Sequence, residues 1–199
     1  MFELAEYIGV IAFAISGFFV GVRSRLDFLG ILISIFLTAF GGGIIRDIMV
    51  DKTPYSFTHT MPGVVVISVM VLLIMFKFHK KDSIENRPLF ILSDSIGLSS
   101  FSITGAISAI EANFNLTGVM AISFVAAVGG GIMRDVIINE VPFVFKTGFY
   151  GTVSLLVGLL IFILNYINLL NGFTIIITFA LALSIRLFAY YKKWSLPML

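Results

Sequence analysis

Seven long apolar runs constrain what this chain can fold into. They cover residues 5–22, 28–50, 62–78, 88–110, 117–138, 147–166 and 172–191. Each is close to the roughly 20 residues that an α-helix needs to cross the hydrocarbon core of a bilayer. A chain inside lipid must satisfy its own backbone hydrogen bonds. We therefore expect an all-α membrane protein with seven transmembrane helices in a single domain, residues 1–199.

Composition supports a membrane location and excludes several classes of function. Hydrophobic residues make up 59% of the chain and charged residues 12%, whereas soluble domains carry about 25% charged residues. The absence of cysteine excludes thiol catalysis and thiolate metal sites. The formal charge of +2 is too small to indicate a nucleic-acid partner. Neither a nucleophile–base pattern nor a phosphate-binding loop is visible, so we predict neither an enzyme nor a cofactor.

Lysine and arginine gather in the connections on one side of the predicted membrane. That side carries Arg23, Arg25, Lys77, Lys80, Lys81, Arg87, Lys146, Lys192 and Lys193, and the other side carries only Lys52. By the positive-inside rule we expect a cytoplasmic C-terminus and an outside N-terminus in the cell inner (plasma) membrane. The first run has no basic flank before it, so we expect a retained span rather than a signal peptide. Lys77, Lys80 and Lys81 are also candidates for holding anionic membrane lipid.

One motif occurs twice in the chain. Three glycines followed by an Arg-Asp pair stand at Gly41, Gly42, Gly43, Arg46 and Asp47, and 88 positions later at Gly129, Gly130, Gly131, Arg134 and Asp135. The same offset, without a gap, aligns Glu6 with Asp94 and Pro54 with Pro142. We therefore predict a repeat, with copy one at about residues 5–80, copy two at about 88–167 and an extra helix at about 172–191. Because each copy has three spans, the copies should be inverted in the membrane.

The glycine triplets fall near the middle of their spans and have two interpretations. Small residues let membrane helices approach closely. Alternatively, the triplets unwind or kink the helices and free carbonyl oxygens for a dehydrated cation. Since charged residues follow both triplets, we favour the second interpretation and expect a monovalent cation near them.

The motif charges should face a protein interior or a wet cavity. Adjacent residues on a helix point about 100° apart, so we expect Arg46 and Asp47 not to face each other. The candidate partners of the arginines then lie on other spans and are Glu6, Asp94 or the aspartate of the other copy. The charges either clamp the copies together or line a path, and these roles can overlap.

Two matched stripes of small residues mark the first and fourth spans. They consist of Ala5, Gly9, Ala12 and Ser16, and of Ser93, Gly97, Ser100 and Thr104. The stripes indicate either tight helix packing or a wall lined by hydroxyls such as those of Ser16 and Thr104. Asp94 is a candidate entrance charge, and we expect Arg186 to snorkel to the interface.

The doubled motif, seven spans and three-span repeats resemble the prokaryotic trimeric intracellular cation (TRIC) channels, which overlap a bacterial group of glycine-transporter-like membrane proteins. The resemblance implies a homotrimer with one pore in each subunit, permeable to monovalent cations and chiefly to potassium. It also implies kinked spans at the two glycine triplets and motif charges at Arg46, Asp47, Arg134 and Asp135.

We therefore predict a potassium-permeable channel whose partners are potassium or sodium ions, membrane lipid and two further copies of the chain. Glycine carbonyls, with Ser16 and Thr104, should replace part of the ion's hydration. Asp47, Asp94 and Asp135 should favour cations. The alternative is a secondary transporter whose buried arginine and aspartate hold a small zwitterion such as glycine. A third interpretation is a structural membrane subunit.

Overall fold

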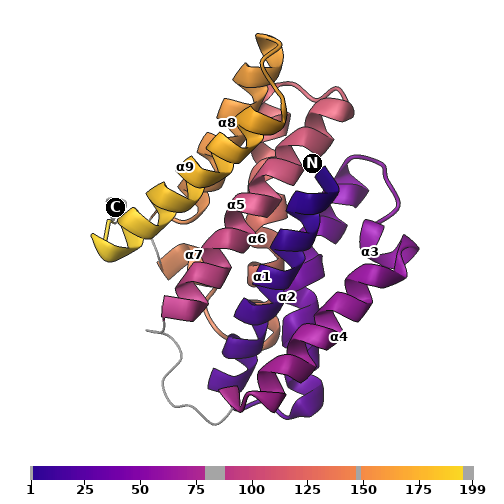
Figure 1. Cartoon of the computed structure of the whole chain (residues 1–199), viewed down its shortest axis with the longest axis vertical. Coiled ribbons are helices and arrows are strands. Elements are labelled where there is room, and N and C mark those ends of the chain that lie inside the picture. Colours follow the sequence, from indigo (N-terminus) through magenta and orange to yellow (C-terminus); the bar gives the residue numbers. More distant parts are fainter. Residues whose placement is uncertain (1, 79–87, 147–148, 195–199) are drawn as a thin grey trace.

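The described part of the chain is helical throughout its regular structure (Figure 1). The structure is a computed structural model, and it describes residues 2–78, 88–146 and 149–194. These residues form α1 (Phe2–Arg23), α2 (Phe28–Met49), α3 (Tyr55–Thr58), α4 (Thr60–Met75), α5 (Pro88–Glu111), α6 (Leu116–Ile137), α7 (Phe143–Lys146), α8 (Gly151–Tyr166) and α9 (Gly172–Tyr191). The predicted all-α membrane fold is therefore confirmed. Lys80, Lys81 and Arg87, which the sequence places in the basic connections, lie outside the described residues.

Five of these helices, α1, α2, α5, α6 and α9, are long and apolar enough to cross a membrane. The two shorter apolar helices, α4 and α8, have 16 residues each, or about 24 Å of helix against a core of about 30 Å. Passage of α4 and α8 through the whole bilayer stays a prediction. The two one-turn helices, α3 and α7, lie in the connections after α2 and α6, and the sequence did not predict them.

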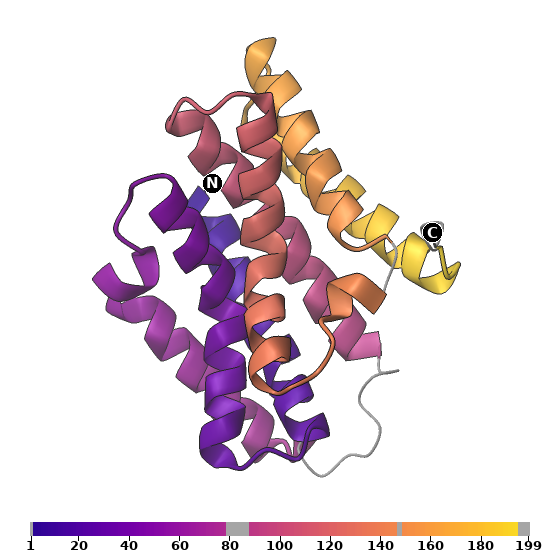
Figure 2. The same cartoon turned by 180° about the vertical axis from the view of Figure 1, so that it is seen from behind.

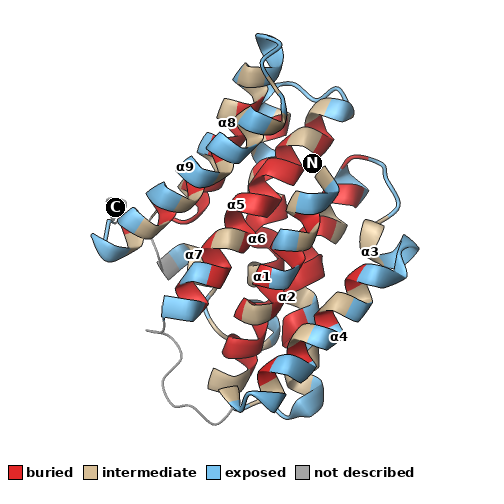
Figure 3. Cartoon of the chain, viewed as in Figure 1, coloured by how far each residue is buried: buried red, intermediate tan, exposed pale blue. Residues whose placement is uncertain are grey.

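Helix α5 forms the centre of the molecule, as its burial shows (Figure 3). The most apolar stretch of α5 is 83% buried, whereas that of α9 is only 22% buried. The outer faces of α4 and α9 carry exposed residues such as Ile67, Met75 and Phe173. Figure 1 places α4 and α9 at opposite edges, with α1, α2, α5 and α6 between them. An apolar outer surface on helices, whose backbone hydrogen bonds are satisfied internally, is the arrangement that lipid requires.

The helix ends repeat at the same offset as the motif. The side chain of Asp27 caps α2 by accepting from the Gly30 amide at 2.7 Å, and that of Asn115 caps α6 by accepting from Gly118 at 2.9 Å. Asp and Asn are favoured N-caps because their oxygens satisfy an amide that the helix leaves free. Arg25 and Asn113, also 88 positions apart, both have positive φ just beyond α1 and α5. The sequence repeat thus produces matching local structure in both copies.

Helices α2 and α6 lie side by side at the back of the molecule (Figure 2). A Cβ at Gly42 would overlap the carbonyl oxygen of Ala126. A Cβ at Gly130 would lie 2.5 Å from the backbone carbonyl oxygen of Thr38. Thr38 of α2 lies beside Gly130 of α6, and the later residue Gly42 lies beside the earlier residue Ala126. The two helices therefore run antiparallel. Their motif charges consequently lie at opposite ends of the crossing.

The glycine triplets do not unwind their helices. Residues 28–49 and 116–137 are each continuous α-helix, so the predicted unwinding is wrong, whereas a kink at the triplets stays a prediction. The first two glycines of each triplet instead allow the backbones to touch: a Cβ on Gly41 would lie 3.0 Å from the Gly130 Cα. Close approach through small residues, the alternative interpretation, explains the triplets.

The small-residue stripes also serve packing. A Cβ on Gly9 would lie 2.8 Å from the Phe101 ring, and one on Gly97 would overlap the Phe13 ring. The two rings stack on each other between α1 and α5, with centroids 5.3 Å apart. Each glycine therefore accommodates the aromatic ring of the opposite helix, and the packing interpretation holds at these positions.

Candidate functional site

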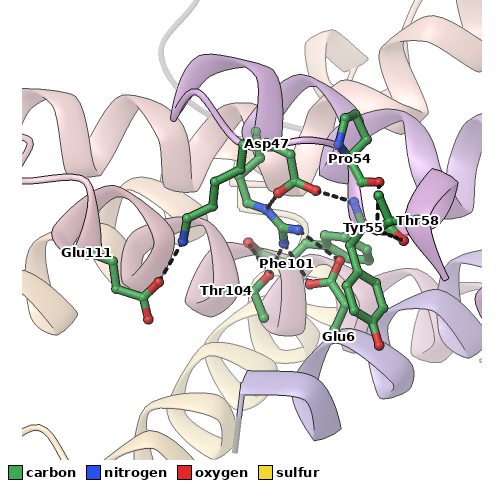
Figure 4. Close-up of polar contacts among 10 residues, drawn as sticks. Glu6, Asp47, Pro54, Tyr55, Thr58, Phe101, Thr104 and Glu111 are labelled. Atoms are coloured by element: carbon green, nitrogen blue, oxygen red, sulfur yellow. Dashed lines mark hydrogen bonds and ion pairs between the residues drawn. The ribbon is translucent and has the colours of Figure 1, made fainter.

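The first motif forms a buried charge cluster around Arg46. This side chain is fully buried. Its Nη1 lies 2.6 Å from Glu6 Oε2, and its Nη2 lies 3.0 Å from Glu6 Oε1. Nη1 also donates to the Thr104 hydroxyl at 2.9 Å. These two contacts with Glu6 form the strong bidentate geometry of an arginine–carboxylate pair. Figure 4 shows Glu6 and Thr104 converging on this cluster from α1 and α5.

Arg46 also binds its own neighbour, Asp47. Its Nε donates to Asp47 Oδ1 at 2.8 Å, so the prediction that the two residues do not face each other is wrong. The arginine side chain is long and flexible enough to bend around the helix and reach the adjacent aspartate, although the two residues point about 100° apart. The second carboxylate oxygen of Asp47 accepts from the Tyr55 amide at 2.9 Å. Asp47 thereby joins α2 to the start of α3.

The second motif repeats this geometry at the other end of the crossing. Arg134 Nε and Nη2 both lie 2.8 Å from Asp135 Oδ1. Asp135 Oδ2 accepts from the Phe143 amide at 2.8 Å, and Phe143 stands 88 positions after Tyr55. Both motifs therefore hold the first turn of a short helix through the second oxygen of the aspartate.

The two clusters differ in their third partner. Glu6 reaches Arg46, whereas its counterpart Asp94 is one methylene shorter and accepts instead from the Ser16 hydroxyl at 3.1 Å. Arg134 contacts the Thr38 hydroxyl at 3.4 Å. The sequence named Glu6 and Asp94 as possible partners; the structure selects Glu6 for Arg46 and gives Arg134 no ion pair with Asp94 among the described contacts.

The third glycine of each triplet faces its cluster. A Cβ on Gly43 would lie 3.4 Å from Glu6 Oε1 and 3.8 Å from Arg46 Nη2. On Gly131 it would meet only Arg134 Nη2, also at 3.8 Å. The missing side chains leave room beside the guanidinium groups. Each triplet thus combines two packing glycines with one that borders the site.

The space around the clusters is unequal. The second cluster opens into a cavity of about 230 Å³, lined by Arg134, Asp135 and Phe143 together with Arg23 and Glu140. The cavity beside Glu6 and Asp47 holds only about 10 Å³, about the least that one water molecule needs. The second cluster therefore borders ample space for water, whereas the first, called the sealed cluster below, borders space for one water at most.

Each end of the molecule carries a further ion pair. Arg23, the last residue of α1, binds Glu140 beside the open cavity. At the other end Lys52 Nζ lies 2.8 Å from Glu111 Oε2 (Figure 4). Lys52, the lone basic residue of its side in the sequence, is therefore paired.

An aromatic pair covers the sealed cluster from the α3 side. The hydroxyls of Tyr7 and Tyr55 lie 3.3 Å apart, and the Tyr55 ring stacks on His59 with centroids 4.0 Å apart. The hydrogen bond with Tyr7 raises the pKa of Tyr55 to about 12. Tyr55 is consequently neutral at physiological pH and adds no charge to the cluster.

Arg186 does not snorkel to the interface. It is 2% exposed, and its guanidinium lies 4.8 Å from the centroid of the Tyr150 ring. Hydropathy alone could not reveal this, because the rings of Phe143 and Tyr150, which face the charge, lie outside α9. The sequence likewise missed Thr38, and it missed the amides of Tyr55 and Phe143, for which the 88-residue offset offered a signal.

The described residues contain no cluster of three histidine, aspartate or glutamate side chains that could hold a metal ion. Each motif aspartate is already shared between a guanidinium and an amide. The clusters are therefore suited to shaping an electrostatic field rather than to fixing a multivalent metal, which needs several free oxygen ligands.

Together, the apolar outer surface and the two buried charge clusters define a multi-pass helical membrane protein with a polar interior. The chain belongs to the family described as Glycine transporter, whose model matches residues 3–80 and 91–166. The UPF0126 membrane protein YvgT of Bacillus subtilis is 33% identical over 98% of this chain and 95% of its own length. The UPF0126 inner membrane protein YadS of Escherichia coli is 30% identical over 77% of this chain and 74% of its own.

Solved structures confirm the resemblance to TRIC channels. A chain solved in work on conductance through TRIC cation channels is 32% identical, with a TM-score of 0.86 over 100% of this chain and 97% of its own. A prokaryotic TRIC channel crystallised in 0.5 M KCl is 28% identical, with a TM-score of 0.89 over 98% of both chains. A TRIC orthologue from Rhodobacter sphaeroides, 24% identical with a TM-score of 0.87 over 97% of this chain and 98% of its own, shares the fold.

Proposed function

We propose that this protein is a monovalent-cation channel, permeable to potassium, with a path through each subunit of a homotrimer. The likeness to TRIC cation channels over nearly the whole chain supports this function. The trimeric state and the ion are proposals on the same basis. The ion moves by passive diffusion, so no catalytic group and no cofactor is needed.

The charge balance of the polar interior carries the proposal. Among the described residues, the buried charged side chains are four acids and three arginines: Glu6, Asp47, Asp94 and Asp135, with Arg46, Arg134 and Arg186. Their formal sum is −1. Both motif arginines also bind carboxylates directly. An unpaired arginine would repel potassium, whereas this arrangement presents a weakly cation-attracting interior.

The proposed path joins the two clusters through the polar core. It runs from the open cavity at Arg134 and Asp135, past Asp94 and Ser16, to Thr104 and the sealed Arg46–Asp47 cluster. Because the helices are intact, side-chain oxygens replace the ion's hydration in this account, and glycine carbonyls do not. A monovalent cation then passes close to Gly43 and Gly131, with Gly41, Gly42, Gly129 and Gly130 holding the helices that frame it.

The membrane arrangement completes the proposal. Seven crossings in two inverted copies place the open cavity on the basic, cytoplasmic side and the sealed cluster outside. The N-terminus is then outside and the C-terminus in the cytoplasm of the inner membrane. Lys77 lies at the cytoplasmic edge of α4, where it can contact anionic lipid.

Transport of a zwitterion such as glycine is less well supported. In the form that the sequence suggests, such a transporter would take the substrate carboxylate with a motif guanidinium. Arg46 already contacts Glu6, Asp47 and Thr104, and Arg134 contacts Asp135 and Thr38. Neither motif arginine is available without breaking a buried ion pair, which costs about 3–5 kcal/mol.

Reversal potentials in a KCl gradient test the charge assignment. We expect wild-type channels in planar bilayers to prefer potassium over chloride, and Asp47→Asn/Asp135→Asn channels to lose part of that preference. The variant must elute as the same oligomer as the wild type. Unchanged potassium selectivity in a correctly assembled variant contradicts the role given to these aspartates.

A further inference from the structure

Arg186 lies at the junction of α9 with the second cluster, although α9 is outside the sequence repeat. Its Nε and Nη2 atoms are buried and make no hydrogen bond among the described residues. Two donors of a permanently charged group without acceptors are costly in a dry interior. The position of Arg186 therefore needs a compensating interaction.

Aromatic rings supply part of this compensation. The guanidinium lies 4.8 Å from the ring centroid of Tyr150 and 5.9 Å from those of Phe143 and Tyr190. The negative face of an aromatic ring attracts a cation placed over it. Phe143 and Tyr190 also line the open cavity, and the Phe143 amide holds Asp135. Arg186 is thus bound to the wall of the second cluster.

Asp94 supplies the opposite charge. It is 3% exposed, and its Oδ2 atom is buried without a hydrogen-bond partner among the described residues. Burial disfavours its negative charge, whereas Arg186 and Arg134 attract it. Helix α5, which carries Asp94, packs directly on α9. No ion pair joins Asp94 and Arg186 among the described contacts, so the two buried charges attract one another across this packing without touching.

We propose that Arg186 is the positioning residue for Asp94, through which α9 sets the charge that the cytoplasmic half of the cation path presents. Glu6 is held by the arginine of its own cluster, but the shorter Asp94 is not, and Arg186 takes that place from a third element. The inference rests on the proposed function for its effect on conduction, but the pairing itself does not.

Single-channel recording at low salt tests the effect on conduction. Arg186→Gln should raise potassium conductance by about twofold at about 0.05 M KCl, and less at 1 M, because salt screens the released Asp94 charge. Arg186→Lys keeps the charge and should restore wild-type conductance. Lys192→Gln removes an exposed charge from the same end of α9 and should change little.

Repeating the Arg186→Gln substitution in an Asp94→Asn channel shows whether Arg186 acts through Asp94 or directly on the permeating ion. If Arg186 acts through Asp94, Arg186→Gln should have no effect on conductance in an Asp94→Asn channel. An equal increase in both backgrounds would overturn the proposal.

Melting of the purified protein in detergent tests the pairing without any conduction. Arg186→Gln should lower the melting temperature by about 5 °C or more when Asp94 is present, and by clearly less with Asp94→Asn. Additive shifts would refute the pairing. Non-conducting wild-type protein with a coupled melting cycle would instead refute the proposed function and leave the pairing intact.

Discussion

Single glycines in each triplet have different roles, although the sequence presents them as equals. Gly42 faces the Ala126 carbonyl at the helix crossing, whereas Gly131 faces open space beside Arg134. A sequence pattern can indicate that small residues are needed. It does not say which neighbour each one meets, because that depends on the rotation of the helix.

Alanine substitutions separate these roles. We expect Gly42→Ala to lower the free energy of unfolding by about 1–3 kcal/mol or more, since overpacking a tight crossing forces the backbones apart. Gly131→Ala is the matched control and should leave the melting temperature near that of the wild type. Equal destabilisation by both variants would contradict the packing described for α2 and α6.

Glu6 closes the first cluster by pairing with Arg46. Glu6→Gln removes the carboxylate that holds both terminal nitrogens of Arg46. We expect a loss of about 3–5 kcal/mol in the free energy of unfolding, because a buried guanidinium loses its main counter-charge. Denaturant or thermal melting in detergent measures it. Glu3→Gln, an exposed acid one turn earlier, is the control, and a similar effect there would contradict this account.

The charge clusters were predictable only in part at this scale. The doubled motif identified Arg46, Asp47, Arg134 and Asp135, and the 88-residue offset paired Glu6 with Asp94. Side-chain length then decided which acid reaches its arginine, and no periodicity encodes that. The flexibility of arginine likewise allowed pairing with the adjacent aspartate, against the expectation from helix angles.

At the scale of elements, apolar length predicted the long helices well. The observed α2 and α6 differ from their predicted spans by one residue at most at either end, since caps at Asp27 and Asn115 fix their starts. The one-turn helices α3 and α7 escaped prediction because four residues show no periodicity. Their position depends on a hydrogen bond that the first backbone amide of each helix donates to a motif aspartate.

Helix α8 approaches the backbone of α6 closely at Gly158. A Cβ on Gly158 would lie 2.9 Å from the Met120 Cα, whereas one on Gly63 in α4 would meet no atom within 4 Å. We expect Gly158→Ala to lower the melting temperature and Gly63→Ala to leave it unchanged or slightly raised. Equal behaviour of the two variants would contradict the packing of α8 on α6.

At the scale of the whole molecule, two similar clusters stand at opposite ends of one antiparallel crossing. One is sealed and the other opens to a cavity of about 230 Å³. The sequence predicted two matching sites but not their inequality. Glu6 pairs with Arg46, whereas Asp94 forms no ion pair with Arg134 among the described contacts, and Tyr190 of α9 lines the open cavity.

Ion flux through purified protein in liposomes tests the central claim most directly. We predict potassium currents in discrete single-channel steps when the same preparation is recorded in bilayers, and no saturable glycine uptake or counterflow. Glycine counterflow without potassium conductance would contradict the channel and favour a transporter, and complete inertness of folded protein would favour a structural subunit.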